Sequence, residues 1–304
     1  PTCPFPNPEI KEALAKGLEL CNVVKPDLLL ATDPDCDRVG IAVPSDNGYE
    51  LFTGNEVGAM LLEYICSERT KMGTMPADPV AVKTIVTTDI AAKIAKEYGV
   101  KLIEVLTGFK FIGEQIGFLE DKGQEDRYIF GFEESYGYLA GSYVRDKDAV
   151  VASMLICEMA AFYRTKGISL IQARENMYKK YGVYVHSQSS FVCEGVTGME
   201  RMKEIMSDLR TNTPKTIGGL TVTRFEDYLA STSVDTATGA KTMLTLPKSD
   251  VLTFKLTDGA SVIIRPSGTE PKIKAYYTTT GTTKAEAAAL EKTISDDFAK
   301  ILGF

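Results

Sequence analysis

Apolar and polar positions alternate along the chain in blocks that predict strands and helices in turn. The run DLLLAT at 27–32 is apolar throughout, as is typical of a buried parallel strand. Asn7 and Pro8 predict a helix start ahead of this run, because asparagine caps helices and proline favours their first turn. A further helix is expected at about 55–69, followed by a linker at 71–79.

The same alternation continues to about residue 180. Strands are expected at 80–88, 100–107 and 128–135, and helices at 89–99, 110–121, 148–165 and 169–180. Strands and helices that alternate at this spacing are typical of a doubly wound α/β domain with a parallel or mixed sheet.

The pattern changes after Gly182. Strands are expected at 183–193, 220–225, 250–257, 260–265 and 273–279, with helices at 198–210 and 284–302. Strands clustered in this way predict a smaller α+β domain with an antiparallel sheet. We therefore expect three parts: the C-terminal part of an α/β domain at 1–52, an α/β domain at 53–182, and an α+β domain at 183–304.

Composition narrows the class of protein. The chain has 304 residues, 34 Lys+Arg against 41 Asp+Glu, and a formal net charge of −7. An acidic balance counts against nucleic-acid binding, which needs a basic surface. No apolar run approaches the ~18 residues of a membrane span, so no membrane partner is expected. Six scattered cysteines without a CxxC pair favour reduced thiols and a cytoplasmic location.

The sharpest motif is ATDPDCDRVG, which follows the first apolar strand. Its three carboxylates, Asp33, Asp35 and Asp37, lie at i, i+2 and i+4, which places them on one side of an extended chain. An EF-hand needs glycine and glutamate where Arg38 and Pro44 stand. We favour Mg²⁺ completed by a phosphoryl oxygen, with Arg38 as an anion clamp. The alternative is an exposed acidic turn.

A second motif, VIIRPSGTEPKIKAYY, contains a polar turn between two strands. Arg265 offers a bidentate hydrogen-bond donor, and Ser267 and Thr269 offer hydroxyls. Gly268 lets backbone N–H groups approach an anion. The chain has no GxxxxGK[ST] sequence, so this turn predicts a phosphate site without a P-loop. The alternative is an ordinary polar hairpin turn.

A third motif, GFEESYG, ends a predicted strand with Glu133 and Ser135. A carboxylate accepts hydrogen bonds and a hydroxyl both donates and accepts, so the pair suits sugar hydroxyls; the alternative is a solvated loop. Thr107 and Gly108 also end a predicted strand and are expected to contact the substrate. Lys147 lies nearby in VRDKDA, where a salt-bridged surface lysine is the ordinary interpretation.

Together and in this order, the three motifs resemble those of the α-D-phosphohexomutase family, which includes phosphoglucomutase and phosphomannomutase. TDPDCDR resembles the metal-binding loop, GFEESYG the sugar-binding loop, and RPSGTEP the phosphate-binding loop. FEES is closer to the glucose-directed form of the sugar loop than to the form that contains methionine. The resemblance implies Mg²⁺ as cofactor, a hexose 1,6-bisphosphate as activator and intermediate, and a sugar phosphate as substrate.

The resemblance also implies a role for each matching residue. Arg38 would contact the phosphoryl group, and Lys147 would be the candidate for proton transfer. The remaining roles are metal binding by Asp33, Asp35 and Asp37, sugar binding by Glu133 and Ser135, and binding of the non-reacting phosphate by Arg265, Ser267, Gly268 and Thr269.

One family feature is missing from the sequence. Family members carry a phosphorylated serine in a Ser-His-Asn-Pro-like motif, and these 304 residues contain no Ser-His dipeptide, since the only histidine is His186 after valine. We therefore expect a fragment of a mutase whose partners are the N-terminal domains of the same chain. The alternatives are a phosphopentomutase of the same family and a non-catalytic protein that binds phosphosugars.

Overall fold

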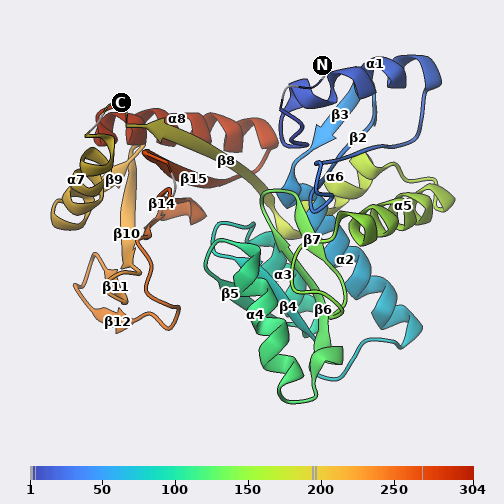
Figure 1. The fold of residues 1–304 in the computed structure, drawn as a ribbon, viewed down its shortest axis with the longest axis horizontal. Coiled ribbons are helices and arrows are strands. Elements are labelled where there is room, and N and C mark those ends of the chain that lie inside the picture. The colour runs from blue at the N-terminus through green and yellow to red at the C-terminus, as the bar shows by residue number, and fades with distance from the viewer. Residues whose placement is uncertain (1–2, 4, 194, 196, 269) are drawn as a thin grey trace. The chain divides into compact units, whose positions relative to one another are not determined.

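The computed structural model describes residues 3, 5–193, 195, 197–268 and 270–304. The chain divides into two compact units, residues 1–181 and 182–304 (Figure 1). In the described residues, no helix is both long and apolar enough to cross a membrane.

The first unit begins with a three-stranded antiparallel sheet. Its strands are β1 (Leu29–Thr32), β2 (Val39–Ser45) and β3 (Gly48–Phe52), in the order β1-β2-β3. The predicted parallel pairing of the first strand is wrong: β1 pairs antiparallel with β2 and is only half-buried. β2 is its one partner among the described residues. An apolar run indicates a strand that favours burial, but it does not specify the direction of the partner.

The predicted helix start at Asn7 and Pro8 is also wrong. The Asn7 side chain accepts a hydrogen bond from the Glu9 N–H, which forms a turn in place of a helix cap. A 3₁₀ helix follows at Lys11–Leu14, and α1 begins only at Ala15 and runs to Val24. Asparagine followed by proline favours turns as well as helix starts, so the local sequence did not separate the two outcomes.

A second sheet forms the rest of the first unit. Its order is β5-β4-β6-β7, with β4 parallel to both β5 and β6 and with β7 antiparallel to β6. The strands are β4 (Val80–Thr84), β5 (Lys101–Val105), β6 (Tyr128–Glu133) and β7 (Gly137–Leu139). The first two end earlier than predicted, so residues 85–88 and 106–107 lie in loops at the carboxyl edge. This parallel core confirms the doubly wound α/β prediction.

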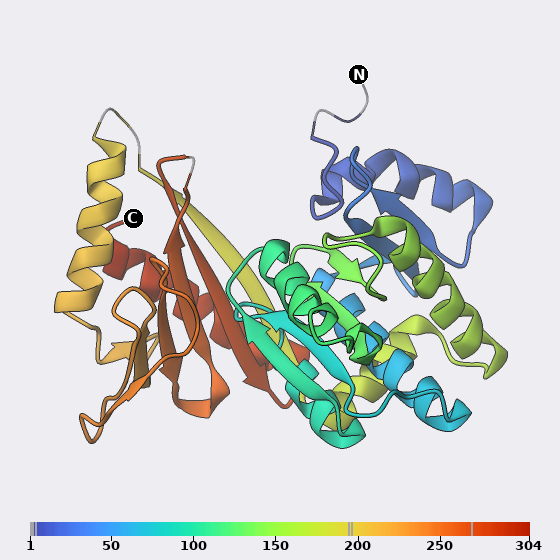
Figure 2. The same ribbon diagram turned by 60° about the horizontal axis from the view of Figure 1, so that its bottom comes forward.

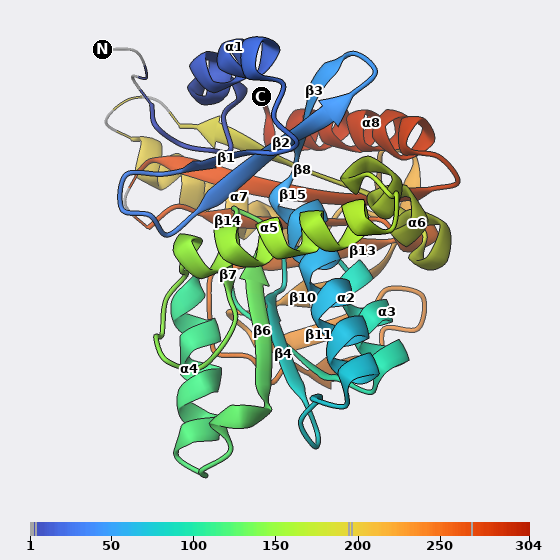
Figure 3. The same cartoon turned by 90° about the vertical axis from the view of Figure 1, so that its right-hand side faces the viewer.

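Helices cover both faces of this second sheet (Figure 3). They are α2 (Gly54–Met72), α3 (Ile90–Tyr98), α4 (Phe109–Glu120), α5 (Ala149–Thr165) and α6 (Leu170–Tyr181). α2 starts at a capping box in which Thr53 and Glu56 satisfy each other's backbone N–H groups. Ile112 and Ile116 of α4 pack on Val80 and Val82 of β4 in the apolar core.

The second unit is built on one antiparallel sheet. The strand order is β12-β11-β10-β13-β14-β15-β8, with β9 paired to β10. The strands are β8 (Val183–Val192), β9 (Thr216–Ile217), β10 (Leu220–Asp227), β11 (Thr232–Asp235), β12 (Lys241–Met243), β13 (Leu252–Leu256), β14 (Ser261–Pro266) and β15 (Lys272–Gly281). β8 and β15 are long neighbours (Figure 2). The predicted antiparallel α+β domain is confirmed.

Two helices supply the apolar residues that cover this sheet. α7 (Gly198–Thr211) contributes Met202 and Leu209, and α8 (Lys284–Leu302) contributes Ile294 and Phe298. α8 begins with a second capping box, formed by Thr283 and Glu286. The sheet therefore holds the β14–β15 turn, where the predicted phosphate site lies, on a packed support.

Candidate functional site

The loop between β1 and β2 brings the three predicted metal ligands together. One carboxylate oxygen from each of Asp33, Asp35 and Asp37 lies within 4.8 Å of the others. The Asp33 carboxylate accepts hydrogen bonds from the backbone N–H groups of Asp37 (3.1 Å) and Arg38 (3.0 Å), which folds the loop back on itself. Cys36 allows this reversal by adopting a φ of +57°.

Charges around the loop are unevenly compensated. Burial alone would raise the pKa of Asp33, but hydrogen bonds from the Arg38 backbone N–H and from the Asp37 side chain and backbone outweigh it and hold that pKa below its usual value. Burial raises the pKa of Asp37, although the Lys147 ammonium lies 2.6 Å from its Oδ2. The Asp37 Oδ1 is buried and accepts no hydrogen bond from any described residue.

This donor set fits a hard divalent cation. Magnesium takes oxygen ligands, and it commonly keeps one or two protein carboxylates together with phosphate oxygens and water. Three crowded carboxylates repel one another unless a cation lies among them. The buried Oδ1 of Asp37, which accepts no hydrogen bond within the described chain and has only the Arg38 Nε at 3.8 Å as an ion-pair partner, gives such a cation a ligand atom.

The turn between β6 and β7 adjoins the metal loop. Glu133 ends β6 and is 5 % exposed, and Ser135 lies in the turn. The Val39 N–H donates to the Tyr136 carbonyl at 3.1 Å, and Arg38 forms an antiparallel bridge with Gly137. The residues predicted to bind metal and those predicted to bind sugar are thus linked through the backbone.

Gly137 is the point where the two loops come closest. A Cβ at this position would lie 2.6 Å from Cδ of Lys147 and 2.9 Å from Oε1 of Glu133. Any other residue here would displace one of these two side chains. Lys147 therefore forms an ion pair with Asp37 and lies close to the buried carboxyl of Glu133.

Glu133 has a strongly altered acidity. Burial and the neighbouring Glu134 charge raise the pKa of its carboxyl to about 7, against the opposing effect of Lys147 and Arg38. Lys147 shows the opposite balance. Burial would lower the pKa of its ammonium, but Asp37 and Asp146 raise it above its usual value, so the lysine is a cation at neutral pH.

The loop between β5 and α4 approaches the same lysine. Gly108 has a φ of +116° and immediately precedes the helix. The Lys147 Nζ lies 5.9 Å from the ring centroid of Phe109, the first residue of α4. The Thr107 Oγ1 is buried and has no hydrogen-bond partner in the described chain, so this hydroxyl is available to a ligand.

The predicted phosphate loop belongs to the second unit, at the turn between β14 and β15. Arg265 is half-buried near the end of β14, and its Nε has no hydrogen-bond partner among the described residues. The Ser267 N–H donates to the Lys272 carbonyl at 2.8 Å. Gly268 is exposed, and Thr269 lies outside the described residues. The paired strands β14 and β15 carry this guanidinium and this serine at their end.

Sequence reasoning missed one residue near the metal loop. The Glu9 Oε1 accepts a hydrogen bond from Arg38 Nη1 at 2.9 Å, across 29 positions of sequence. A single carboxylate in a proline-rich segment gives no periodic or motif signal, so only the fold reveals this contact.

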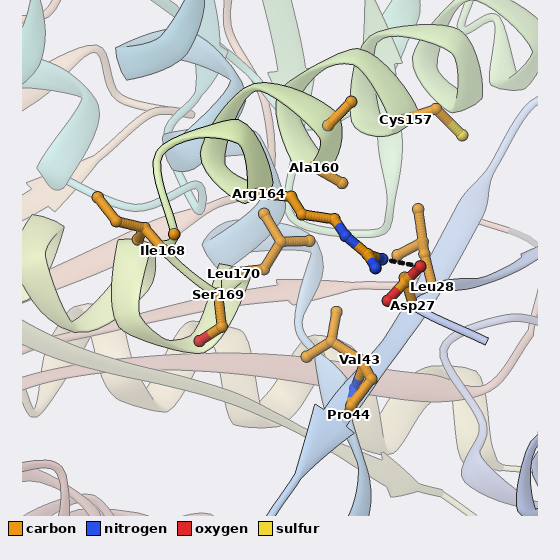
Figure 4. A pocket seen from close by; sticks show the side chains of 12 residues that line it. Asp27, Leu28, Val43, Pro44, Cys157, Ala160, Arg164, Ile168, Ser169 and Leu170 are labelled. Atoms are coloured by element: carbon orange, nitrogen blue, oxygen red, sulfur yellow. Dashed lines mark ion pairs between the residues drawn. The ribbon is translucent and has the colours of Figure 1, made fainter. Parts of the chain in front are cut away.

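A pocket of about 520 Å³ lies elsewhere in the first unit. It is largely apolar, with Leu28, Val43 and Ile168 in its wall, and Arg164 forms an ion pair with Asp27 beside them (Figure 4). None of the predicted site residues lines it. The residues predicted to bind metal and sugar lie instead in or directly beside loops at the edges of the two sheets of the first unit.

Comparison with known families matches most of the chain. The family described as phosphoglucomutase/phosphomannomutase matches through three of its domain models: alpha/beta/alpha domain II at residues 1–47, alpha/beta/alpha domain III at 53–181, and the C-terminal domain at 209–296.

The curated relatives agree with this match. Proteins named phosphoglucomutase from Staphylococcus aureus strains bovine RF122 / ET3-1 and MRSA252 are each 38% identical over 271 residues, which is 89% of this chain and 48% of the relative. The chain therefore spans about half the length of these relatives.

Solved structures agree on the fold. Parafusin, an exocytosis-sensitive phosphoprotein and phosphoglucomutase from Paramecium, matches 97% of this chain and 50% of its own, with a TM-score of 0.68 and 20% identity. A phosphoglucomutase/phosphomannomutase family protein from Burkholderia thailandensis matches 98% of this chain and 51% of its own, with a TM-score of 0.60 and 15% identity. Motifs, domain matches and fold together establish that this chain belongs to the phosphoglucomutase/phosphomannomutase family.

Proposed function

We propose that this chain carries the metal-, sugar- and phosphate-binding loops of a phosphohexomutase. The reaction moves a phosphoryl group between C1 and C6 of a hexose phosphate, through a phosphoserine and a hexose 1,6-bisphosphate. The supporting observation is the junction at Gly137, where Lys147 pairs with Asp37 of the acidic cluster and lies close to the buried Glu133. The 38% identity to proteins named phosphoglucomutase supports the same reaction.

In this proposal the metal loop receives the phosphoryl group. Asp33, Asp35 and Asp37 hold Mg²⁺, which supplies positive charge to phosphoryl oxygens. Arg38 donates hydrogen bonds to the same group. Lys147 is an ammonium beside Asp37, so it is placed to give a proton to an oxygen that leaves phosphorus.

The remaining loops hold the sugar phosphate. Glu133 and Ser135 bind sugar hydroxyls, and Thr107 and Gly108 make further contacts with the substrate. The non-reacting phosphate is bound by Arg265, Ser267, Gly268 and Thr269. Most of the rate enhancement in such a reaction comes from positioning and charge, because phosphoryl transfer needs little covalent help from the protein.

The phosphoryl carrier is a serine that these 304 residues do not supply, since they hold no Ser-His dipeptide. In the first transfer the bond from phosphorus to the serine oxygen breaks and a bond from phosphorus to a sugar oxygen forms; the serine oxygen takes a proton from Lys147, and the proton of the sugar hydroxyl leaves to solvent. In the second transfer the other phosphoryl group goes from its sugar oxygen back to the serine oxygen, so that this sugar oxygen takes a proton and the serine hydroxyl gives one up. We further propose three domains, at 1–52, 53–182 and 183–304, and a cytoplasmic location.

Calorimetric titration of the 304-residue chain with glucose 1,6-bisphosphate tests the proposal. We expect binding that requires Mg²⁺ and that weakens about tenfold or more when Ser135→Ala removes a sugar contact or Asp35→Asn removes a ligand charge. Asp46→Asn, in the exposed turn between β2 and β3, is the matched control. Binding that ignores Mg²⁺ and both site variants would contradict the proposal.

A further inference from the structure

The segment before the 3₁₀ helix is held against the metal loop. Pro8 is buried, and a Cβ on Gly40 of β2 would lie 2.8 Å from the Pro8 carbonyl oxygen and 2.9 Å from its Cβ. The Asn7 carboxamide accepts a hydrogen bond from the Glu9 N–H at 3.0 Å. Glycine permits this close packing, and the turn fixes the backbone. The backbone position from which the Glu9 side chain extends is therefore defined.

Glu9 reaches the one arginine of the metal loop. Its Oε1 accepts from Arg38 Nη1 at 2.9 Å, and the Glu9 side chain is only 19 % exposed. The Nε of Arg38 lies 4.0 Å from Asp33 and 3.8 Å from Asp37, which is too long for a hydrogen bond to either. Glu9 therefore makes the only side-chain hydrogen bond to this guanidinium among the described residues.

We propose that Glu9 is a positioning residue for Arg38: it holds one end of the guanidinium away from the aspartates so that the rest can bind a phosphoryl oxygen. This inference deepens the proposed function and depends on it. Without Glu9, the nearest acceptors for Arg38 are the predicted metal ligands themselves. An arginine paired with these aspartates could not donate hydrogen bonds to the phosphoryl group. Its positive charge would also repel the metal cation.

The proposal and simple electrostatics predict opposite changes in anion affinity when Glu9 is neutralised. Glu9 carries a negative charge close to a site for anions, so neutralising it should strengthen anion binding if charge alone mattered. If Glu9 positions Arg38, neutralising it should weaken binding, because the arginine loses its charge-assisted hydrogen bond and its fixed orientation. The direction of the change therefore separates the two roles.

The experiment measures binding of glucose 1,6-bisphosphate with Mg²⁺ to the 304-residue chain and its Glu9→Gln variant, which keeps the side-chain size. We expect Kd to rise about tenfold, a coupling of ordinary size for two groups in contact. Glu12→Gln is the matched control, because Glu12 is exposed and forms no ion pair with any residue that the structure describes. Its Kd should stay within about twofold.

A double-mutant cycle assigns the effect to Arg38. In an Arg38→Gln background, Glu9→Gln should no longer weaken binding, whereas a general loss of structure would weaken it in both backgrounds. Melting temperatures of all variants are compared to identify unfolding. A Glu9→Gln variant that binds as tightly as the wild type, or more tightly, would overturn the inference while leaving the proposed function intact.

Nuclear magnetic resonance of the unliganded chain tests the contact without any ligand. The Nε–Hε signal of Arg38 should be that of an ordered guanidinium in the wild type and in Glu12→Gln, and it should broaden or average in Glu9→Gln. A mobile Arg38 in the wild type would overturn the inference. Absence of bisphosphate binding by the wild type, with an ordered Arg38, would contradict the proposed function instead.

Discussion

Replacing Glu133 by glutamine should stabilise the first unit at neutral and alkaline pH. The carboxyl lies at the end of β6, 5 % exposed, and its pKa is raised from 4.5 to about 7. Between these two values the folded chain binds more protons at this position than the unfolded chain does. The free energy of unfolding therefore falls as the pH rises through this window, and it stays lowered above it.

The size of the effect follows from the shift. A difference of about 2.5 pKa units between 4.5 and about 7 corresponds to about 3 kcal/mol once the folded group is ionised, at 1.36 kcal/mol per unit. Glutamine keeps the shape of the side chain and cannot ionise. The free energy of unfolding of the Glu133→Gln variant should thus exceed that of the wild type by up to about 3 kcal/mol at pH 8.5. At pH 4 the two free energies should be nearly equal.

Urea unfolding of the metal-free chain, followed by circular dichroism between pH 4 and 8.5, measures this difference. Because the chain divides into two compact units, a two-state fit is not assumed and any separate transitions are fitted individually. Glu114→Gln, on the exposed side of α4, serves as the control and should leave the pH profile unchanged. Parallel pH profiles for the wild type and Glu133→Gln would show that burial does not raise the pKa of this carboxyl and would refute the reasoning.

Three further predictions concern the proposed activity. The 304-residue chain should show no turnover of glucose 1-phosphate with a bisphosphate activator, because it lacks a phosphoryl carrier; turnover above a heat-killed, metal-free control would contradict this. Its Mg²⁺ binding should be weak in calorimetry, since phosphate oxygens complete such sites, and tight binding that survives Asp35→Ala would place the cation elsewhere. In a complete enzyme, Arg265→Ala should lower kcat/KM roughly 10²-fold and Ser267→Ala about tenfold, because the guanidinium makes two charge-assisted hydrogen bonds and serine a neutral one. Near-normal kcat/KM in a folded Arg265→Ala enzyme would show that the turn does not bind phosphate.

The elements with strong periodicity were predictable from the sequence. The expected helices at 89–99 and 284–302 correspond to α3 and α8, and the strand at 128–135 corresponds to β6. β2 was missed although Val39–Val43 is an apolar run that is buried throughout, because so short a run does not by itself separate a strand from a buried helix segment. The family and the mixed α/β fold are confirmed.

The site was predictable only where chemistry is concentrated in sequence. The spacing of Asp33, Asp35 and Asp37 predicted their proximity, which the structure shows within 4.8 Å; that they bind Mg²⁺ stays a prediction. The position of Lys147 beside Asp37 depends on a contact across 110 positions. Contacts of this kind depend on tertiary folding, which no local pattern encodes.

The half-buried strand β1 has a consequence for how the chain behaves in solution. Leu29–Thr32 pairs on one side with β2, and the described residues place no strand on its other side. Exposed Leu20, Val23 and Val24 of the neighbouring α1 add apolar surface nearby. An open edge of backbone N–H and C=O groups beside apolar side chains is a template for edge-to-edge association. Concentrated samples of the 304-residue chain should aggregate through this strand before any other part of the first unit, and a lysine introduced at Ala31 should keep them monomeric.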